Sequence, residues 1–515
     1  MKALPPAIAA LLLSAGLAAA QPAPPPIPPT SAPIPAGSPT QASVDGGALA
    51  GIEAGGLRFF KDIPYAAPPV GPLRWKAPAP APRWSGVRDA SADGPACVQP
   101  VSPDGRPNGG GYAGPISEDC LTLDVFAPAH ASHAPVMVWI FGGGNVAGSD
   151  SIAPNDGRAF ARDGVILVAM NYRLGALGWF AHPALTREAA PGEPLANYGL
   201  MDQIAALKWV KRNIAAFGGD PGNVTIFGES AGGDNVLTLM VTPAARGLFQ
   251  KATVQSGGGR GAPVALADAE SAGQALAVKL GAPADASAEQ LRALPAAAFA
   301  GAAFRAGPVV DGRLVVETPA QGFAKGDQAP APLIIGSNSW EASLLPATGY
   351  AAYLAAAAPA TRAAYTDLAG DPAAQAQAMF TDAVMAAPAR WFARKASRKA
   401  GAWLYEFSYV RVVRRGKIPG ANHTSENPYV FDTQMIVPNY SAEIVDQDRA
   451  VAAFMHSCWV SFAKTGAPTC AVGGRVWPAY SPTTDELLEF TDPPAIRAHY
   501  RQAQLDAQDA AAAAP

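Results

Sequence analysis

The hydrophobic positions of the chain form several uninterrupted runs of strand length, each followed by turn-forming or polar residues. Such runs are typical of strands buried on both faces of a sheet, because neither face then alternates with polar residues. The runs cover residues 136–141, 165–170, 224–227, 332–335 and 403–407.

Between these runs, apolar residues recur at helical spacing. In residues 201–217, side chains such as Ile204 and Leu207 share one face, and Gly218 then supplies a stop signal. A second helix of this kind is predicted over residues 446–464. Alternating strands and helices predict an α/β fold with a large, mostly parallel central sheet flanked by helices. In such sheets, chemistry gathers at the carboxyl ends of the strands.

The two ends of the chain differ in composition from the region between them. Residues 1–20 have a positive start, an apolar stretch and small residues for cleavage, as a signal peptide has. That stretch is shorter than the roughly 20 residues of a membrane-spanning helix, so no stable membrane anchor is expected. Residues 21–43 are rich in proline and alanine and predict a disordered tether. Residues 44–500 are expected to form a single domain, and residues 501–515 a flexible alanine-rich tail.

Composition and charge exclude some classes of binding partner. The net charge is −3, and the basic runs are short, so neither nucleic acid nor an anionic membrane is expected as a partner. The signal peptide indicates a secreted or periplasmic protein, in which four cysteines favour disulfides over metal ligands. Their order and spacing suggest the pairs Cys97–Cys120 and Cys458–Cys470. A zinc site is the alternative, but His456 is the only histidine near a cysteine pair.

The candidate chemistry lies in the stretch FGESAGGD, residues 227–234, which follows an apolar strand and precedes a predicted helix. Glycine is poor inside either element, so its clustering indicates a backbone that is bent for a purpose. This is the context of a nucleophile elbow, with Ser230 at the tip of the turn. The amide of Ala231 would then face a developing oxyanion. A glycine-rich turn without chemistry is the alternative.

A serine nucleophile needs a base and an acid that orients the base, in the chain order Ser, acid, His. His423 lies in a loop after a predicted strand, which suits a base, whereas His456 lies in an apolar helix and His499 lies near the C-terminus. Glu341 follows the strand at 332–335 and is the predicted acid. Asp311 is its competitor, although its Asp-Gly sequence fits a hairpin corner.

Three glycines after the strand at 136–141 complete the candidate site. The amides of Gly143 and Gly144 are predicted to join that of Ala231 in an oxyanion hole. A phosphate-binding loop is the alternative, but no Gly-Lys-Ser/Thr follows, which argues against nucleotide binding. The predicted chemistry needs no organic cofactor and no metal.

The chain resembles the type B carboxylesterase/lipase family, which includes the cholinesterases and has the α/β-hydrolase fold. Its motifs occur in one order over roughly residues 44–500. They lie at residues 60–75 (FKDIPYAAPPVGPLRW), 117–124 (SEDCLTLD), 171–175 (NYRLG), 197–203 (NYGLMDQ), 217–233, 255–257 and 336–338.

The resemblance implies a secreted serine carboxylesterase that hydrolyses small-molecule carboxylic esters through an acyl-serine intermediate. It assigns Ser230 as nucleophile, Glu341 as acid and His423 as base. The resemblance also implies further roles for matching residues. Glu229 and Ser256 would be polar neighbours of the catalytic residues, Arg74 and Glu118 a buried ion pair, and Cys97 and Cys120 a disulfide.

Three features depart from the family pattern. Asp234 adds a carboxylate one helical turn beyond Ser230, where small residues are usual, Ala342 replaces the usual glycine after the acid, and the pair Cys458–Cys470 is not a family feature.

In the cholinesterases, the loop that corresponds to residues 98–119 carries a tryptophan that holds a quaternary ammonium. Here this loop contains Tyr112 but no tryptophan, so a choline-type site is not expected, and the loop is expected to form a mobile, polar rim to the pocket. A catalytically silent binding protein of the same fold, and a lipase acting on emulsified esters, are the alternative functions.

Overall fold

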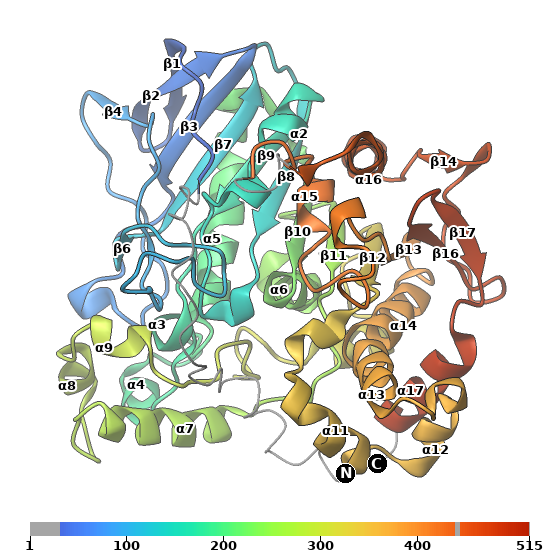
Figure 1. Ribbon diagram of the computed structural model, residues 1–515. Coiled ribbons are helices and arrows are strands. Elements are labelled where there is room, and N and C mark those ends of the chain that lie inside the picture. Colours follow the sequence, from blue (N-terminus) through green and yellow to red (C-terminus); the bar gives the residue numbers. More distant parts are fainter. Residues whose placement is uncertain (1–30, 438–442, 514–515) are drawn as a thin grey trace.

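The protein, described by a computed structural model over residues 31–437 and 443–513, is built on one large mixed sheet (Figure 1). The strands of this sheet are β1 (Ser38–Val44), β2 (Gly47–Ala54), β3 (Leu57–Pro64), β4 (Val87–Asp89), β7 (Thr122–Pro128), β8 (Ala134–Ile140), β9 (Ile166–Met170), β10 (Gly219–Glu229), β11 (Lys251–Gln255), β12 (Leu333–Asn338), β13 (Ala402–Phe407), β16 (Glu486–Phe490) and β17 (Ala495–Ala498). Their order is β1-β2-β3-β7-β9-β8-β10-β11-β12-β13-β16-β17, and β4 pairs with β2.

The centre of the sheet is parallel, from β9 through β8, β10, β11, β12 and β13 to β16. All five apolar runs of the sequence lie in this part, where both faces are covered and β8, β9 and β12 are buried almost throughout. The predicted α/β fold class is therefore confirmed. Because these strands are parallel, the loops that follow β8, β10, β12 and β13 leave the sheet at the same edge.

Helices cover both faces of the sheet. α5 (Tyr198–Asn213), α6 (Ala231–Val241) and α14 (Ala387–Ala396) pack on one face, and α2 (Arg158–Arg162) and α16 (Asp446–Thr465) lie on the other (Figure 1). α5 and α16 correspond to the two helices predicted from apolar periodicity. The other α-helices are α3 (Gly175–Trp179), α4 (Pro183–Glu188), α7 (Leu266–Lys279), α8 (Ala288–Arg292), α9 (Ala297–Ala300), α10 (Pro319–Lys325), α11 (Tyr350–Ala356), α12 (Pro359–Ala363), α13 (Pro372–Thr381), α15 (Asn427–Val430) and α17 (Gln502–Ala513).

The ends of the folded region differ from the sequence expectation. Residues 38–43, expected in the tether, belong to β1, which pairs with β2 from Ser38↔Glu53 to Val44↔Gly47. Residues 502–513, expected in a flexible tail, form α17, in which Leu505 and Gln508 are buried. Alanine favours helix, and these two side chains give the helix a face that packs. The expected signal peptide lies outside the described residues.

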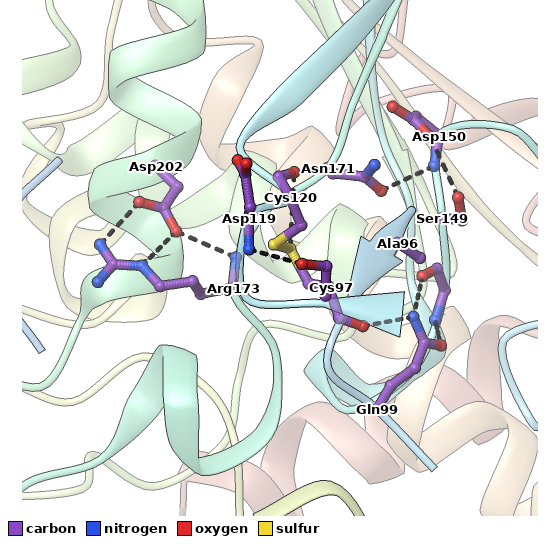
Figure 2. Close-up of a disulfide and its surroundings, with 12 residues drawn as sticks. Ala96, Cys97, Gln99, Asp119, Cys120, Ser149, Asp150, Asn171, Arg173 and Asp202 are labelled. Carbon is purple, nitrogen blue, oxygen red and sulfur yellow. Dashed lines mark hydrogen bonds and ion pairs between the residues drawn. A yellow bond between two sulfur atoms is a disulfide. The ribbon is translucent and has the colours of Figure 1, made fainter. Parts of the chain in front are cut away.

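Both expected disulfides are present. Cys97 bonds to Cys120, and Cys458 on α16 bonds to Cys470. The first closes a loop that begins in β5 (Ala96–Cys97), which pairs with β6 (Ile116–Ser117) (Figure 2). The second lies beside the small ribbon of β14 (Ala471–Val472) and β15 (Arg475–Val476). Within the described part of the chain, no helix has the length and apolar character needed to cross a membrane.

Candidate active site

Ser230 stands at a sharp turn between β10 and α6. Its φ is 56° and its ψ −126°, a conformation that is strained for a residue with a side chain. The neighbouring glycines make the turn possible, because a Cβ on Gly232 would lie 2.0 Å from the carbonyl oxygen of Ile140 and one on Gly228 2.6 Å from the backbone of Gly232. The strand and helix thus pack too closely for side chains. The geometry is that of a nucleophile elbow.

His423 and Glu341 meet at the edge of the sheet where Ser230 lies. The imidazole Nδ1 is 2.6 Å from Glu341 Oε2, and both side chains are buried. The loops that carry them are joined, since the Trp340 amide donates to Ala421 O at 2.9 Å and the His423 amide to Ser343 Oγ at 2.9 Å.

The second oxygen of Glu341 is also occupied. Glu341 Oε1 accepts from Ser256 Oγ and, at 2.8 Å, from the amide of Asn338. These bonds fix the carboxylate so that its other oxygen faces the imidazole. Asp311, the competing acid, accepts from the amides of Leu195, Leu314 and Val315, and so orders its own loop.

The other imidazole nitrogen, Nε2, does not hydrogen-bond to Ser230. Within the described residues its polar neighbour is Glu229 Oε1, at 3.1 Å. Glu229 directly precedes Ser230, so the imidazole is aimed at the end of β10, one residue from the predicted nucleophile. Nucleophile–base contacts are often loose in unliganded sites and tighten when substrate binds.

Three buried carboxyl groups surround His423. Burial raises the pKa of Glu229 to about 8; His423 opposes this shift, and Glu426 and Glu341 add to it. Burial alone would lower the pKa of His423, but the charges of Glu229 and Glu341 outweigh it and raise the value to about 10. Burial also raises the pKa of Glu426. The imidazole therefore holds a proton strongly while these carboxylates are ionised.

Glu426 was not predicted from the sequence. It lies three residues after His423, is fully buried, and accepts from Asn338 Nδ2 and, at 3.3 Å, from Gln255 Nε2. A second unpredicted residue is Asn145, whose Oδ1 accepts from Asn235 Nδ2 of α6 at 2.8 Å. The only sequence signal for either was its closeness along the chain to a predicted site residue.

The glycine loop after β8 lies against the elbow. A Cβ on Gly142 would lie 2.9 Å from Ser230 Cβ, so no side chain fits there. Gly143 and Gly144 have φ values of 69° and 64°. The amides of Gly143, Gly144 and Ala231 donate to no acceptor in the described part of the chain, which leaves them free for a substrate oxygen.

A cavity of about 320 Å³ adjoins this loop. Its walls include Gly110, Gly143, Glu229 and Thr424. The volume is at the lower end of the range for small-molecule sites. A larger cavity of about 590 Å³ is lined by α5 and residues 77–81 and contains none of the predicted site residues.

Away from the site, Arg74 and Glu118 form a two-bonded ion pair, with Nε–Oε1 and Nη2–Oε2 distances of 2.7 Å. Both side chains are largely buried. The imidazole of His456 contacts Val430 O and Asp163, so this side chain has a structural role on α16. The backbone amide of His499 donates to Asp485 O.

The fold and this site define a class, the α/β-hydrolases. The model of the Carboxylesterase family matches residues 38–508, nearly the whole folded region. The chain belongs to the carboxylesterase family and is a carboxylic ester hydrolase.

Proteins with similar sequences are esterases as well. The chain is 37% identical over 474 residues to the para-nitrobenzyl esterase of Bacillus subtilis, covering 86% of this chain and 93% of that protein. It is 34% identical to the fumonisin B1 esterase of Sphingopyxis macrogoltabida, over 86% of this chain and 85% of that one. It is 32% identical to the human cocaine esterase, with the same two coverages.

Solved structures of esterases have the same fold. A PNB esterase structure superposes with a TM-score of 0.76 at 33% identity, covering 91% of this chain and 99% of the other. A thermophilic PNB esterase reaches a TM-score of 0.79 at 32% identity, with the same coverages.

Proposed function

We propose that ester hydrolysis by this protein proceeds through an acyl-serine intermediate on Ser230, with His423 as base and Glu341 as the acid that orients it. The observation that carries the proposal is the 2.6 Å contact between His423 Nδ1 and Glu341 Oε2, at the edge of the sheet where Ser230 occupies the elbow. Nε2 is thereby aimed at the end of β10, where the reacting hydroxyl lies.

In the first step, His423 Nε2 exchanges its contact with Glu229 for one with Ser230 Oγ. It takes the hydroxyl proton as Oγ attacks the ester carbonyl carbon, and the carbonyl oxygen becomes an oxyanion held by the amides of Gly143, Gly144 and Ala231. The imidazolium then protonates the leaving alcohol. In the second step, His423 activates a water that releases the acid and restores the serine.

A fluorophosphonate probe tests the nucleophile. We expect it to label the native protein at Ser230, to leave the Ser230→Ala variant unlabelled, and to abolish hydrolysis of a nitrophenyl ester in proportion to labelling. Ser287→Ala is a matched control, because Ser287 caps α8 at the surface. This variant should be labelled at Ser230 to the same extent as the native protein. Labelling that persists in Ser230→Ala would reject the proposal.

We further propose that the protein is exported before it acts. The composition of residues 1–20 and the presence of two disulfides support export, because disulfides persist in oxidising compartments. N-terminal sequencing of protein recovered from outside the cytoplasm should begin shortly after residue 20. An intact Met1 on active protein in the cytoplasm would contradict export.

A further inference from the structure

Several hydrogen bonds hold the loop that carries the oxyanion glycines, residues 142–148. At its start, the Tyr172 hydroxyl donates to Gly142 O at 3.5 Å. In its middle, Asn145 accepts from Asn235 on the helix that begins at the elbow. Gly148, at the end of the loop, is held as well. The contact at Gly148 comes from a different part of the chain, the loop between Cys97 and Cys120.

Gln99 makes this second contact. Its side-chain Nε2 donates to Gly148 O at 2.8 Å, and the Gly148 amide donates back to Gln99 Oε1 at 2.8 Å. The side chain thus pairs with the backbone of Gly148 as a neighbouring strand would. Gln99 is 1% exposed, so water does not compete for these bonds. Figure 2 shows Gln99 beside the disulfide, on the opposite side from Arg173 and Asp202.

The rest of the Gln99 amide is bound within its own loop. Nε2 also donates to Cys97 O at 3.0 Å, and Oε1 accepts from Asn108 Nδ2 at 2.7 Å. Its two N–H donors and two acceptor positions are therefore all used. Because Cys97 is bonded to Cys120, the side chain has a fixed base from which to hold Gly148.

The same loop also reaches the first oxyanion glycine. Asn108 Oδ1 accepts from the Gly110 amide at 2.9 Å, which fixes the turn at the loop tip. A Cβ on Gly143 would lie 3.4 Å from Gly110 Cα and 3.8 Å from the amide nitrogen of Gly148. Gly110 and Gly148 thus lie close to Gly143, whose amide is predicted to bind the oxyanion.

We propose that Gln99 is a positioning residue for the oxyanion hole, one that sets the orientation of the Gly143 and Gly144 amides by holding Gly148. The inference rests on the proposed function of those amides. Oxyanion donors act because they are fixed before charge develops, so a loop that can drift loses transition-state stabilisation while still admitting substrate. The loop between Cys97 and Cys120 is then part of the catalytic framework, which differs from the mobile rim expected from its composition.

The test uses Gln99→Met, which keeps the length of the side chain but removes its four hydrogen bonds. A trifluoromethyl ketone forms a hemiketal with the nucleophile and places an oxyanion in the hole, whereas the corresponding secondary alcohol cannot. We expect kcat/KM and affinity for the ketone to fall together by about 10- to 100-fold. This fall is no larger than the one caused by removal of an oxyanion donor, because the amides remain and only their orientation is loosened. KM and affinity for the alcohol should stay within about twofold.

Gln508→Met in α17 is the matched control, because Gln508 is also buried and hydrogen-bonded, to Tyr365 OH and Met379 O, but lies away from the site. It should lower the melting temperature without changing the ratio of ketone to alcohol affinity. If Gln99→Met does not fold, Asn108→Ala, at a partly exposed position, replaces it and should show a smaller loss with the same signature.

Two results would overturn the inference: native affinity for the ketone in a folded Gln99 or Asn108 variant, or an equal fall for ketone and alcohol. Failure of the proposed function looks different, because the native protein itself would then form no adduct with the ketone and show no labelled Ser230.

Discussion

At the residue scale, the proposed mechanism makes the pH range of activity depend on the charges around His423. The imidazole must be neutral to accept a proton, yet Glu229 and Glu341 both stabilise its protonated form. In the proposed mechanism, Glu341 orients the ring, so its negative charge is needed for the reaction. Glu229 contacts Nε2, the nitrogen that would face the proposed nucleophile, so its carboxylate should delay the onset of activity as the pH rises.

We therefore expect Glu229→Gln to lower the pKa of His423. Removal of a neighbouring negative charge destabilises the protonated imidazole, so kcat/KM should reach half its plateau at a pH lower by about one unit or more. The pH profile of kcat/KM measures this. Glu426→Gln should shift the profile less, because Glu426 has the weakest influence on His423 of the three carboxylates. An unchanged or raised midpoint in Glu229→Gln would contradict the expectation.

Asp234 is a second carboxylate near the proposed nucleophile, Ser230. Ser230, Ala231 and Asp234 keep some accessible surface, whereas the residues of α6 that follow are buried. Asp234 lies one helical turn beyond Ser230, on the helix that begins at the elbow. The Asp234 carboxylate accepts no hydrogen bond and forms no ion pair within the described residues. Burial raises its pKa to about 6, and the positive charge of Arg305 opposes this shift.

Asp234 and Arg305 should therefore change charge selectivity in opposite directions. We expect Asp234→Asn to lower the kcat/KM of a choline ester relative to its uncharged 3,3-dimethylbutyl analogue by about fivefold, corresponding to about 1 kcal/mol of screened attraction. Arg305→Gln should raise that ratio. The Asp234 effect should be present above pH 6, where the carboxyl is ionised, and fade below it. Equal ratios in all three proteins would show that neither charge reaches the substrate.

At the element scale, the strands that are covered on both faces of the sheet were predictable from the sequence. The elements at the two ends of the folded chain were not. The apolar runs of β8, β9 and β12 identify them as central strands, because a strand that is buried on both faces consists almost entirely of apolar residues. β1 has only Ala42 fully buried, and α17 only Leu505 and Gln508, so neither has a pattern that stands out from a tether or a tail.

The same reasoning applies to the site. The sharp turn at Ser230 was predictable because it is marked by a local sequence of glycines around one serine. Glu426 and Gln99 were not, because what defines them is a partner far along the chain. Gln255 approaches Glu426 from 171 residues away, and Gly148 approaches Gln99 from 49.

Arg74 joins several elements through one guanidinium. Besides the pair with Glu118, its Nη1 donates to the carbonyl oxygens of Arg292 and Leu294, at the end of α8. We expect Arg74→Ala to lower the free energy of unfolding by about 3–5 kcal/mol, because it leaves a largely buried carboxylate and two carbonyls without their donor. Denaturant unfolding measures this loss.

Arg88→Ala is the control for Arg74→Ala. Arg88 also pairs with a carboxylate, that of Asp62, but both side chains are considerably exposed. The loss should be about 1 kcal/mol or less, as for other surface pairs. Equal effects of the two substitutions would mean that burial of the Arg74 pair does not govern its contribution.

At the scale of the whole molecule, the two disulfides join different parts of the fold. Cys97–Cys120 lies just before β7 and supports the loop of Gln99, whereas Cys458–Cys470 connects α16 to the segment before β14. They close loops of 23 and 12 residues in sequence separation, so each should stabilise the fold by about 3 kcal/mol through the entropy of the unfolded chain. Because the two disulfides should contribute similar stability, their separate effects on catalysis can be compared.

We expect the two double variants to separate stability from catalysis. Cys458→Ala/Cys470→Ala should lower the free energy of unfolding by about 3 kcal/mol and leave affinity for the trifluoromethyl ketone at the native value. Cys97→Ala/Cys120→Ala should lose similar stability and also ketone affinity, because the backbone oxygen that helps to hold Gln99 belongs to Cys97. Unfolding curves and ketone inhibition constants, measured well below each melting temperature, give the two quantities. If both variants kept native ketone affinity, the first disulfide would brace only the fold, and the loop it closes would not transmit that support to the oxyanion glycines.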